Sequence, residues 1–365
     1  MLNFSEFQEY IRMNFSEIFE KEKINVELSL NSVTKNNGTE FHALTIRTEG
    51  SNIAANIYLD DSYERYVEGE DLDYLVKQIY RSVAESLVIP YEFTTVGKDL
   101  MDFDYAKDKI IMVAVNAEKN KELLADVPYQ LKEDLALIYK VKLGTNNEEM
   151  ATVTIHNNLL KTWGATKEEI HELAMKNTRE LLPVTIQSID EVMRELLARD
   201  GMPKEIAEAM FTEMPADQQM YVISNKPKVN GAASIFYEDE LAKLAEKLGT
   251  DLYILPSSVH ECIAISEKMS TPDLLVHMVQ EVNGTQVPAD EQLSDHVYRF
   301  DAKERKLSLA DTTVESLEIK DVELTPSFKT EVYNYQVELD KDVDSLDISA
   351  IPIEDDTSVE IAGNQ

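Results

Sequence analysis

The order of strand-like and helical patterns is the feature that most constrains this fold. Between residues 221 and 265, two strand-like segments are followed by an amphipathic helix and two further strands, a β-β-α-β-β order. Near the N-terminus, one helical pattern precedes three strand patterns and a second helical pattern follows them. Such orders are typical of layers in which helices cover one side of a largely antiparallel sheet. The sequence therefore predicts an α+β protein.

A first lobe is predicted over residues 1–90. Apolar residues in the first 21 positions recur at helical spacing, and residues 71–87 repeat that pattern. Between them, three strand patterns are joined by turns, one of which contains the pair Asn37-Gly38. An Asn-Gly pair suits the positive φ angles of a hairpin turn. This lobe is therefore expected to be α-β-β-β-α, with an antiparallel sheet.

A second mixed α/β lobe is predicted over residues 91–305, with a helical insert at 166–214. The insert begins with a capping pattern and includes a predicted helix at 203–214. Residues 116–131 are interpreted as a helix or an irregular loop, and residues 232–237 as a strand. The remaining strand predictions for this lobe are 110–115, 134–143, 152–155, 219–224, 251–255, 260–266 and 297–300.

The pattern changes near Ser308, and residues 310–365 are predicted to form a separate, partial all-β sandwich. Short strand patterns recur there every eight to fifteen residues, with turn residues between them. The same segment holds 15 acidic and three basic residues, so it has the densest negative charge of the chain. The predicted strands are 314–319, 335–339, 346–351 and 359–361.

The formal net charge of −34 limits the partners that this chain can bind. A strongly acidic protein repels phosphate groups, so direct binding to nucleic acid or to an anionic membrane is disfavoured. A basic protein partner fits this charge, and a solvated acidic surface explains it without any partner. No segment has the uninterrupted apolar length of a membrane span, and the N-terminal helix lacks the apolar centre of a signal peptide. A cytoplasmic location is expected.

The densest cluster of chemically capable side chains lies in residues 256–262. Ser258, with Ser257 as its neighbour, could supply a nucleophile, His260 a base and Glu261 an orienting carboxylate. No G-x-S-x-G pattern presents either serine, so the alternative interpretation is that the serines cap a turn and that the other two side chains bond locally. Cys262 is the only cysteine, and its apolar surroundings favour core packing over catalysis.

Cofactor and metal signals are not found in the sequence. The 11 glycines are scattered, and no phosphate-binding glycine pattern occurs. The six histidines form neither a zinc-protease motif nor a paired Cys/His site, and the acidic pairs lack the spacing of a calcium loop. No cofactor and no metal are predicted.

Two resemblances add to these predictions. Pro326, Phe328 and Tyr335 stand where the cadherin-like β-sandwich family carries its "spF" and "Yxv" positions, and residues 310–365 resemble the first half of such a module. A second resemblance rests on Asn230-Gly231-Ala232, Leu255-Pro-Ser-Ser-Val-His-Glu and Leu293-Ser-Asp-His-Val-Tyr, among other stretches. Through these stretches the first 305 residues resemble a family of acidic proteins of gut anaerobes and their mobile elements, classed as a domain of unknown function. That resemblance implies a fold and a bacterial setting but no activity.

Three functional hypotheses follow. The first is a non-catalytic interaction or regulatory factor that binds a basic partner through its acidic surface. The second is a hydrolase that uses Ser258, His260 and Glu261. The third is a surface-associated adhesion component that acts through the C-terminal β-module, since such modules usually occur on bacterial surface proteins.

Overall fold

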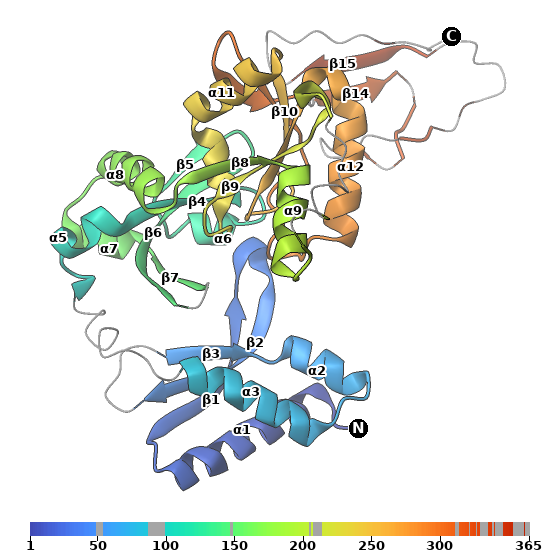
Figure 1. The fold of residues 1–365 in the computed structure, drawn as a ribbon. Coiled ribbons are helices and arrows are strands. Elements are labelled where there is room, and N and C mark those ends of the chain that lie inside the picture. Colours follow the sequence, from blue (N-terminus) through green and yellow to red (C-terminus); the bar gives the residue numbers. More distant parts are fainter. Residues whose placement is uncertain are drawn as a thin grey trace.

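The computed structural model shows an α+β protein in which every sheet is antiparallel (Figure 1). Helices and antiparallel sheets are both present, which confirms the fold class. The residues that the structure describes are 1–48, 54–86, 99–146, 149–203, 206, 214–310, 314–320, 322–325, 327–328, 335–337, 339, 346–352 and 361.

The N-terminal part is a three-stranded sheet with helices packed against it (Figure 1). Its elements are α1 (Phe4–Glu22), β1 (Val26–Thr34), β2 (Glu40–Thr48), β3 (Ala54–Tyr58), α2 (Asp60–Val67) and α3 (Leu72–Ser86). Phe7, Ile11, Phe15 and Phe19 lie one helical turn apart on α1, and all four are buried in one cluster with sheet and α3 residues. This i, i+4 spacing places them on one face and explains why the segment folds as an amphipathic helix.

The expected hairpin turn is confirmed between β1 and β2. Residues Asn36–Gly38 form a single 3₁₀ turn, η1, in which Asn37 has φ 60° and Gly38 has φ 68°. Asparagine and glycine are the residues that adopt this left-handed conformation most readily. The turn therefore lies at the tip of a long hairpin that points away from the N-terminal helices (Figure 1).

The central part begins with a sheet built on the long strand β6 (Leu135–Asn146). Strand β4 (Ile110–Asn116) pairs with one edge of β6, while β5 (Tyr129–Lys132) and β7 (Glu149–Thr154) pair with its other edge. Helix α8 (Lys167–Leu181) packs on β4 and β6 and begins at Thr166, whose hydroxyl accepts a hydrogen bond from the Glu169 amide at 3.2 Å. Short helices flank this sheet: α5 (Phe103–Ala106), η2 (Lys107–Lys109), α6 (Lys121–Leu124) and α7 (Asn157–Trp163).

A six-stranded sheet follows, with the order β13-β12-β10-β11-β9-β8. Its strands are β8 (Val184–Ser188), β9 (Tyr221–Asn225), β10 (Leu252–Leu255), β11 (Cys262–Ser266), β12 (Tyr298–Asp301) and β13 (Lys306–Leu309). The helical segments around it are α9 (Ile189–Arg199), η3 (Ala216–Gln218), η4 (Gly231–Phe236), α11 (Glu238–Leu248), η5 (Glu267–Met269) and α12 (Pro272–Thr285). Side chains of this sheet, of α8 and of the β6 sheet share one large buried cluster, so the two sheets form one core.

The structure corrects the strand prediction for residues 232–237, which form the 3₁₀ segment η4 and the residue after it. Both edges of the neighbouring strand β9 are already paired, with β8 and with β11. A further strand would find no partner there, so the backbone forms its hydrogen bonds within a helical turn. Strands β5, β8 and β13 were not predicted from the sequence. Most of the helix expected at 203–214 lies outside the described residues.

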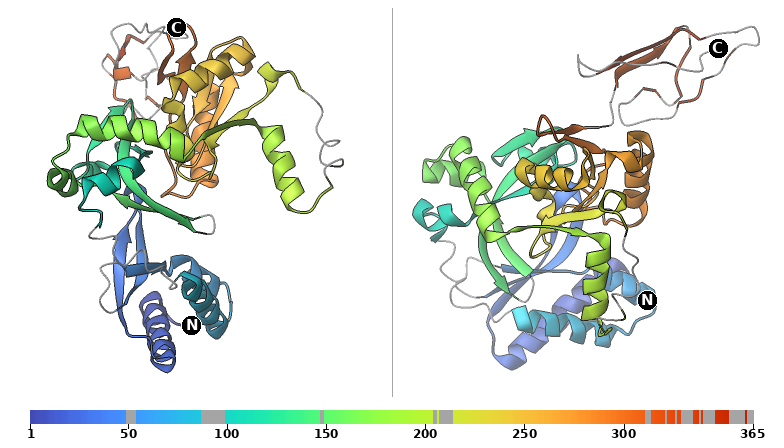
Figure 2. Two further views of the ribbon diagram at one scale, coloured as in Figure 1. Left: turned by 60° about the vertical axis from the view of Figure 1, so that its left-hand side comes forward. Right: turned by 45° about the horizontal axis from the view of Figure 1, so that its top comes forward.

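The C-terminal part contains a two-stranded antiparallel sheet, β14 (Val314–Ile319) and β15 (Ile348–Pro352), with a bulge in β14. This sheet projects from the rest of the molecule (Figure 2). Phe328 and Tyr335 stack with ring centroids 6.1 Å apart, and Thr325 pairs with Gln336 by backbone hydrogen bonds. Of the predicted strand at 335–339, the structure describes residues 335–337 and 339, and Gln336 forms an isolated bridge there in place of a strand. Most of the predicted strand at 359–361 lies outside the described residues.

Candidate functional site

The chemically dense segment lies in the loop between β10 and β11, as predicted. This loop runs beside residues 291–294, to which it is tied by three backbone hydrogen bonds. The Val259 amide donates to the Glu291 carbonyl at 2.8 Å, and the Leu293 amide donates to the Ser257 carbonyl at 3.0 Å. The Ser294 amide donates to the Pro256 carbonyl at 2.9 Å. The loop is therefore held almost as a strand would be, although it lies outside the regular sheet.

A close backbone approach fixes the other side of the loop. The Gly231 amide donates to the His260 carbonyl at 3.0 Å, and the Ser224 hydroxyl donates to the same carbonyl at 2.7 Å. A Cβ atom on Gly231 would lie 2.2 Å from Ser224 Oγ and 2.6 Å from the His260 carbonyl oxygen. Only glycine fits at this position, since any other side chain would force the two segments apart.

His260 is held through both ring nitrogens. Its Nδ1 accepts a hydrogen bond from the Asn230 amide at 3.2 Å, and its Nε2 lies 3.4 Å from Glu291 Oε1. A backbone amide can only donate, so Nδ1 carries no proton and the neutral ring bears its proton on Nε2, toward the carboxylate. The ring therefore links the β9–α11 connection to the 291–294 segment.

Ser258 contacts the backbone of His260 and not its ring. The Ser258 hydroxyl oxygen accepts a hydrogen bond from the His260 amide at 3.0 Å, and the residue is only 7% exposed. In the described part of the chain, the imidazole nitrogens contact Asn230 and Glu291 instead. The structure thus brings the two residues together as a local turn, the arrangement that the non-catalytic interpretation of this cluster describes.

Glu261 and Cys262 differ in their surroundings. Burial raises the pKa of the half-buried Glu261 carboxyl, an effect that His260 partly offsets and Glu291 reinforces. Cys262 is fully buried, and burial raises the pKa of its thiol far above the usual value. A protonated, inaccessible thiol is neither a nucleophile nor a metal ligand. The prediction that Cys262 packs in the core is confirmed.

The hairpin tip docks on the same region, which the sequence did not reveal. The Asn37 amide donates to Asn120 Oδ1 at 2.9 Å, and Asn120 Nδ2 donates back to Asn37 Oδ1 at 2.9 Å. Asn37 Nδ2 also donates to the carbonyls of Ala289 and Gln292, at 2.8 and 2.7 Å. The sequence did carry one signal of this docking, the second asparagine before Gly38. A hairpin turn alone requires only one asparagine, so the other indicated a further contact.

Two further contacts extend this junction. Asn36 Nδ2 donates to the Asp290 carbonyl at 2.8 Å, and Lys35 Nζ lies 3.9 Å from Asp290 Oδ2. The Lys35 ammonium also sits over the rings of Tyr58 and Phe41, at 3.8 and 4.4 Å from their centroids. The hairpin tip, the segment after β4 and residues 289–292 therefore meet in one polar junction, next to the loop that carries His260.

Two histidines outside this region, His156 and His171, make ordinary structural contacts. His156 Nδ1 lies 2.9 Å from Asp126 Oδ2, and His171 Nδ1 lies 3.0 Å from the Tyr139 hydroxyl. Burial lowers the pKa of His171. Over the residues that the structure describes, no three histidine, cysteine or acidic side chains gather as a metal site requires. Nor is any described helix both long and apolar enough to cross a bilayer.

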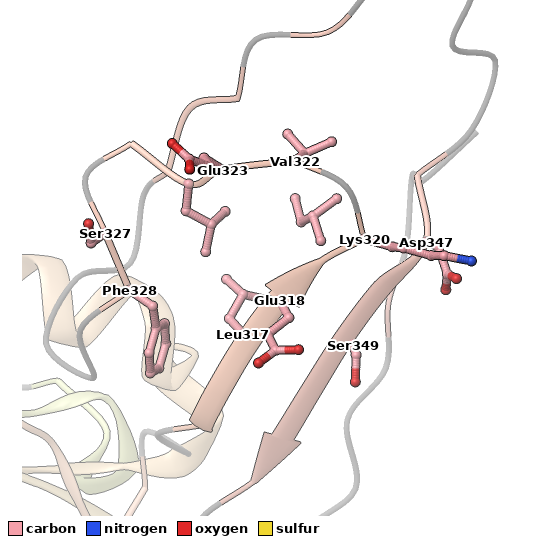
Figure 3. A pocket seen from close by; sticks show the side chains of 11 residues that line it. Leu317, Glu318, Lys320, Val322, Glu323, Ser327, Phe328, Asp347 and Ser349 are labelled. Atoms are coloured by element: carbon pink, nitrogen blue, oxygen red, sulfur yellow. The ribbon is translucent and has the colours of Figure 1, made fainter.

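The C-terminal part has a groove of its own, beside β14 and β15 (Figure 3). Its volume is about 660 Å³, and its wall combines apolar side chains such as Leu317 and Phe328 with charged ones such as Glu318 and Lys320. All of the lining residues come from positions 317–349. The groove is therefore separate from the loop that carries His260.

Comparison with known proteins shows a family match over most of the chain. A family described as a family of unknown function, DUF5688, matches residues 4–302. No curated protein and no solved structure matches the chain. Since the match spans the N-terminal sheet, the β6 sheet and the six-stranded sheet through β12, the chain belongs to the DUF5688 family of unknown function.

Proposed function

We propose that this protein is a non-catalytic interaction factor that binds a basic protein partner through its acidic surface. The observation that carries the proposal is the formal net charge of −34. Such a charge attracts a cationic partner over about 10 Å at moderate ionic strength and accelerates its encounter. It also repels nucleic acids and anionic lipids, so a basic protein is the complementary class of macromolecule.

The contacts around His260 support binding rather than catalysis. A serine nucleophile requires a base within about 2.6–3.2 Å of its hydroxyl. Here the imidazole contacts Asn230 and Glu291, while the Ser258 hydroxyl accepts from a backbone amide. These side chains stabilise a junction between three segments, and such a junction presents a defined surface to a partner.

The proposal extends to the organisation and setting of the protein. Residues 1–90 and 91–305 act as two domains, and residues 310–365 act as a cadherin-like β-module. The protein works in the cytoplasm of a gut anaerobe or as a product of its mobile elements. The stacked pair Phe328 and Tyr335 supports the β-module, since these are two of the positions on which the resemblance depends.

One contact favours hydrolysis as a second function. The pair of Glu291 and His260 is a carboxylate next to an imidazole, the arrangement that orients a catalytic base. For hydrolysis, the ring would have to leave the Asn230 amide and reach Ser258. Activity toward ester and phosphoester substrates that is lost in both Ser258→Ala and His260→Gln would establish this alternative.

The interaction proposal is tested by capture from lysate followed by measurement with purified components. Tagged protein is mixed with cell lysate at about 50 mM salt, and the captured proteins are identified. The dissociation constant of a purified candidate is then measured from about 50 to 500 mM salt. We expect a basic partner whose affinity falls steeply with salt, because the attraction is screened. An affinity that does not change over this range would refute the proposal.

A further inference from the structure

A polar cavity of about 860 Å³ lies beside the polar junction. Its wall comes from the end of β4 and the segment after it, from the turn between β5 and β6, from the C-terminal half of α12 and from the segment before β12. This volume is within the range of about 300–1,000 Å³ that is usual for ligand sites. The residues that matter for its chemistry are Asn116, Lys119, Asp134, Asn283, Gln292 and Asp295.

Three of the four amide side chains on this wall, those of Asn116, Asn283 and Gln292, already donate hydrogen bonds within the protein, and the fourth is that of Gln280. Asn116 Nδ2 donates to the Leu293 carbonyl at 2.9 Å. Asn283 Nδ2 donates to the Ser294 carbonyl at 2.8 Å and to Asp295 Oδ1 at 2.7 Å. Gln292 Nε2 donates to the carbonyls of Asn283 and Val287, at 2.8 and 3.2 Å.

The ammonium of Lys119 is also engaged within the protein. Its Nζ donates to Gln292 Oε1 at 3.2 Å and lies 3.5 Å from Asp295 Oδ2. This ion pair neutralises one positive and one negative charge at the cavity. These three amides and the ammonium are therefore poorly placed to bind an anionic ligand.

Acceptors, in contrast, remain available on the same wall. Asn283 is only 4% exposed, and among the residues that the structure describes its Oδ1 has no hydrogen-bond partner. An unpaired buried acceptor costs about 1–3 kcal/mol, which a donor from a ligand would recover. Asn283 thus points to a ligand that donates hydrogen bonds.

Asp134 is the second available acceptor. Its two carboxylate oxygens accept hydrogen bonds from the hydroxyls of Ser294 and Tyr298, and the Ser294 distance is 2.6 Å. Burial and the adjacent carboxylate raise the pKa of Tyr298 well above its usual value, so this phenol keeps its proton and donates it. Each carboxylate oxygen can accept a further hydrogen bond. Asp134 therefore presents an oriented negative charge.

The charges on the cavity wall also favour a cationic ligand. Three carboxylates line the cavity, those of Glu118, Asp134 and Asp295, against the single ammonium of Lys119. The remainder of the molecule adds to this negative potential, because its net charge is −34. Cations are concentrated in such a cavity, and anions are repelled from it.

We propose that this cavity is a binding site for a cationic side chain, the guanidinium or ammonium group of an arginine or lysine on the partner. The inference rests on the proposed function and gives it an anchor point. The acceptors of Asn283 and Asp134 select a group that donates hydrogen bonds, and the carboxylate excess selects a positive charge. Arginine is the better match, because its five donors can reach several acceptors at once.

The probe for this site is capped arginine, Nα-acetyl-arginine amide, titrated into the whole protein at low salt and followed by ligand-observed NMR. The control ligand is the citrulline analogue, which has nearly the same shape and no charge. We expect capped arginine to bind at least about tenfold more tightly than the citrulline analogue, since charge-assisted hydrogen bonds are roughly twice as strong as neutral ones. Equal binding of both ligands would overturn the inference.

Two variants should act in opposite directions. Asp134→Asn keeps the shape and removes the charge, so the affinity for capped arginine should fall about tenfold or more. Lys119→Met removes the internal ammonium that competes for Asp295, so the affinity should rise by several-fold. Glu246→Gln, an exposed residue on α11, loses the same unit of charge away from the cavity and should leave the affinity unchanged.

The two directions separate a site effect from misfolding. If Asp134→Asn unfolds, the test rests on Lys119→Met. A gain in affinity for capped arginine in that variant would support the site, because a damaged protein would not bind more tightly. A loss in Lys119→Met, or no change in a folded Asp134→Asn, would refute the site. If a basic partner binds with salt-dependent affinity that Asp134→Asn leaves unchanged, this site is refuted and the proposed function stands. If capped arginine binds as expected but no basic partner is captured, the site stands and the proposed function fails.

Discussion

Replacing Asn37 by glycine should release the hairpin tip from the polar junction. The substitution retains the left-handed backbone, since glycine adopts the φ of 60° without strain. It removes three side-chain hydrogen bonds, two donated to the carbonyls of Ala289 and Gln292 and one accepted from Asn120. At about 0.5–1.5 kcal/mol for each bond, docking should weaken by about 2–4 kcal/mol.

Hydrogen–deuterium exchange by mass spectrometry measures this effect directly. A loss of about 2–4 kcal/mol would increase local opening by about 30-fold or more. Faster exchange is expected in peptides that cover residues 35–39, 117–121 and 289–293. Peptides from the centre of β6 should not change, because that strand lies in the shared core.

The matched control is Asn31→Ala on the same hairpin. Among the described residues, the Asn31 side chain donates to Ser29 and Thr45 of the N-terminal sheet, so its loss leaves the junction intact. If Asn37→Gly changes exchange no more than this control does, or changes it only within the N-terminal sheet, the docking contacts carry little free energy. The Asn37 side chain would then not be what holds the hairpin tip in the polar junction.

Three further predictions concern the loop that carries His260. Gly231→Ala should destabilise the protein by about 1–3 kcal/mol in chemical denaturation. Adding Ser224→Ala should restore only part of this loss, because two of the three atoms nearest to the new Cβ belong to the backbone. Full restoration would contradict the reasoning. Glu261→Gln should stabilise the protein at neutral pH but not near pH 4, since a raised carboxyl pKa in the folded state lowers stability as pH rises above 4.5. Melting temperatures of the variant and the unmodified protein that do not diverge between pH 4 and pH 7 would count against it. Cys262 should react with a thiol reagent only after unfolding, because it is fully buried; rapid labelling of the native protein would show that the core opens there.

The local patterns of this chain determined most of its elements. Apolar residues one helical turn apart made α1 predictable, because the spacing of Phe7, Ile11 and Phe15 matches the geometry of a helix. The turn at Asn37 and Gly38 was equally local, since it depends on which residues tolerate a positive φ. The same logic placed the loop that carries His260 between two strands.

The arrangement of the candidate site was decided by tertiary structure. Whether residues 232–237 form a strand depends on a free edge at β9, and that edge is taken by strands distant in the sequence. The His260 ring contacts Glu291 rather than Ser258, because the 291–294 segment lies beside its loop. Glu291 is 31 positions further along the chain. Hydrogen bonds and charges act over a few ångströms in space, whatever the separation along the chain, so a sequence pattern can name the groups without saying which of them meet.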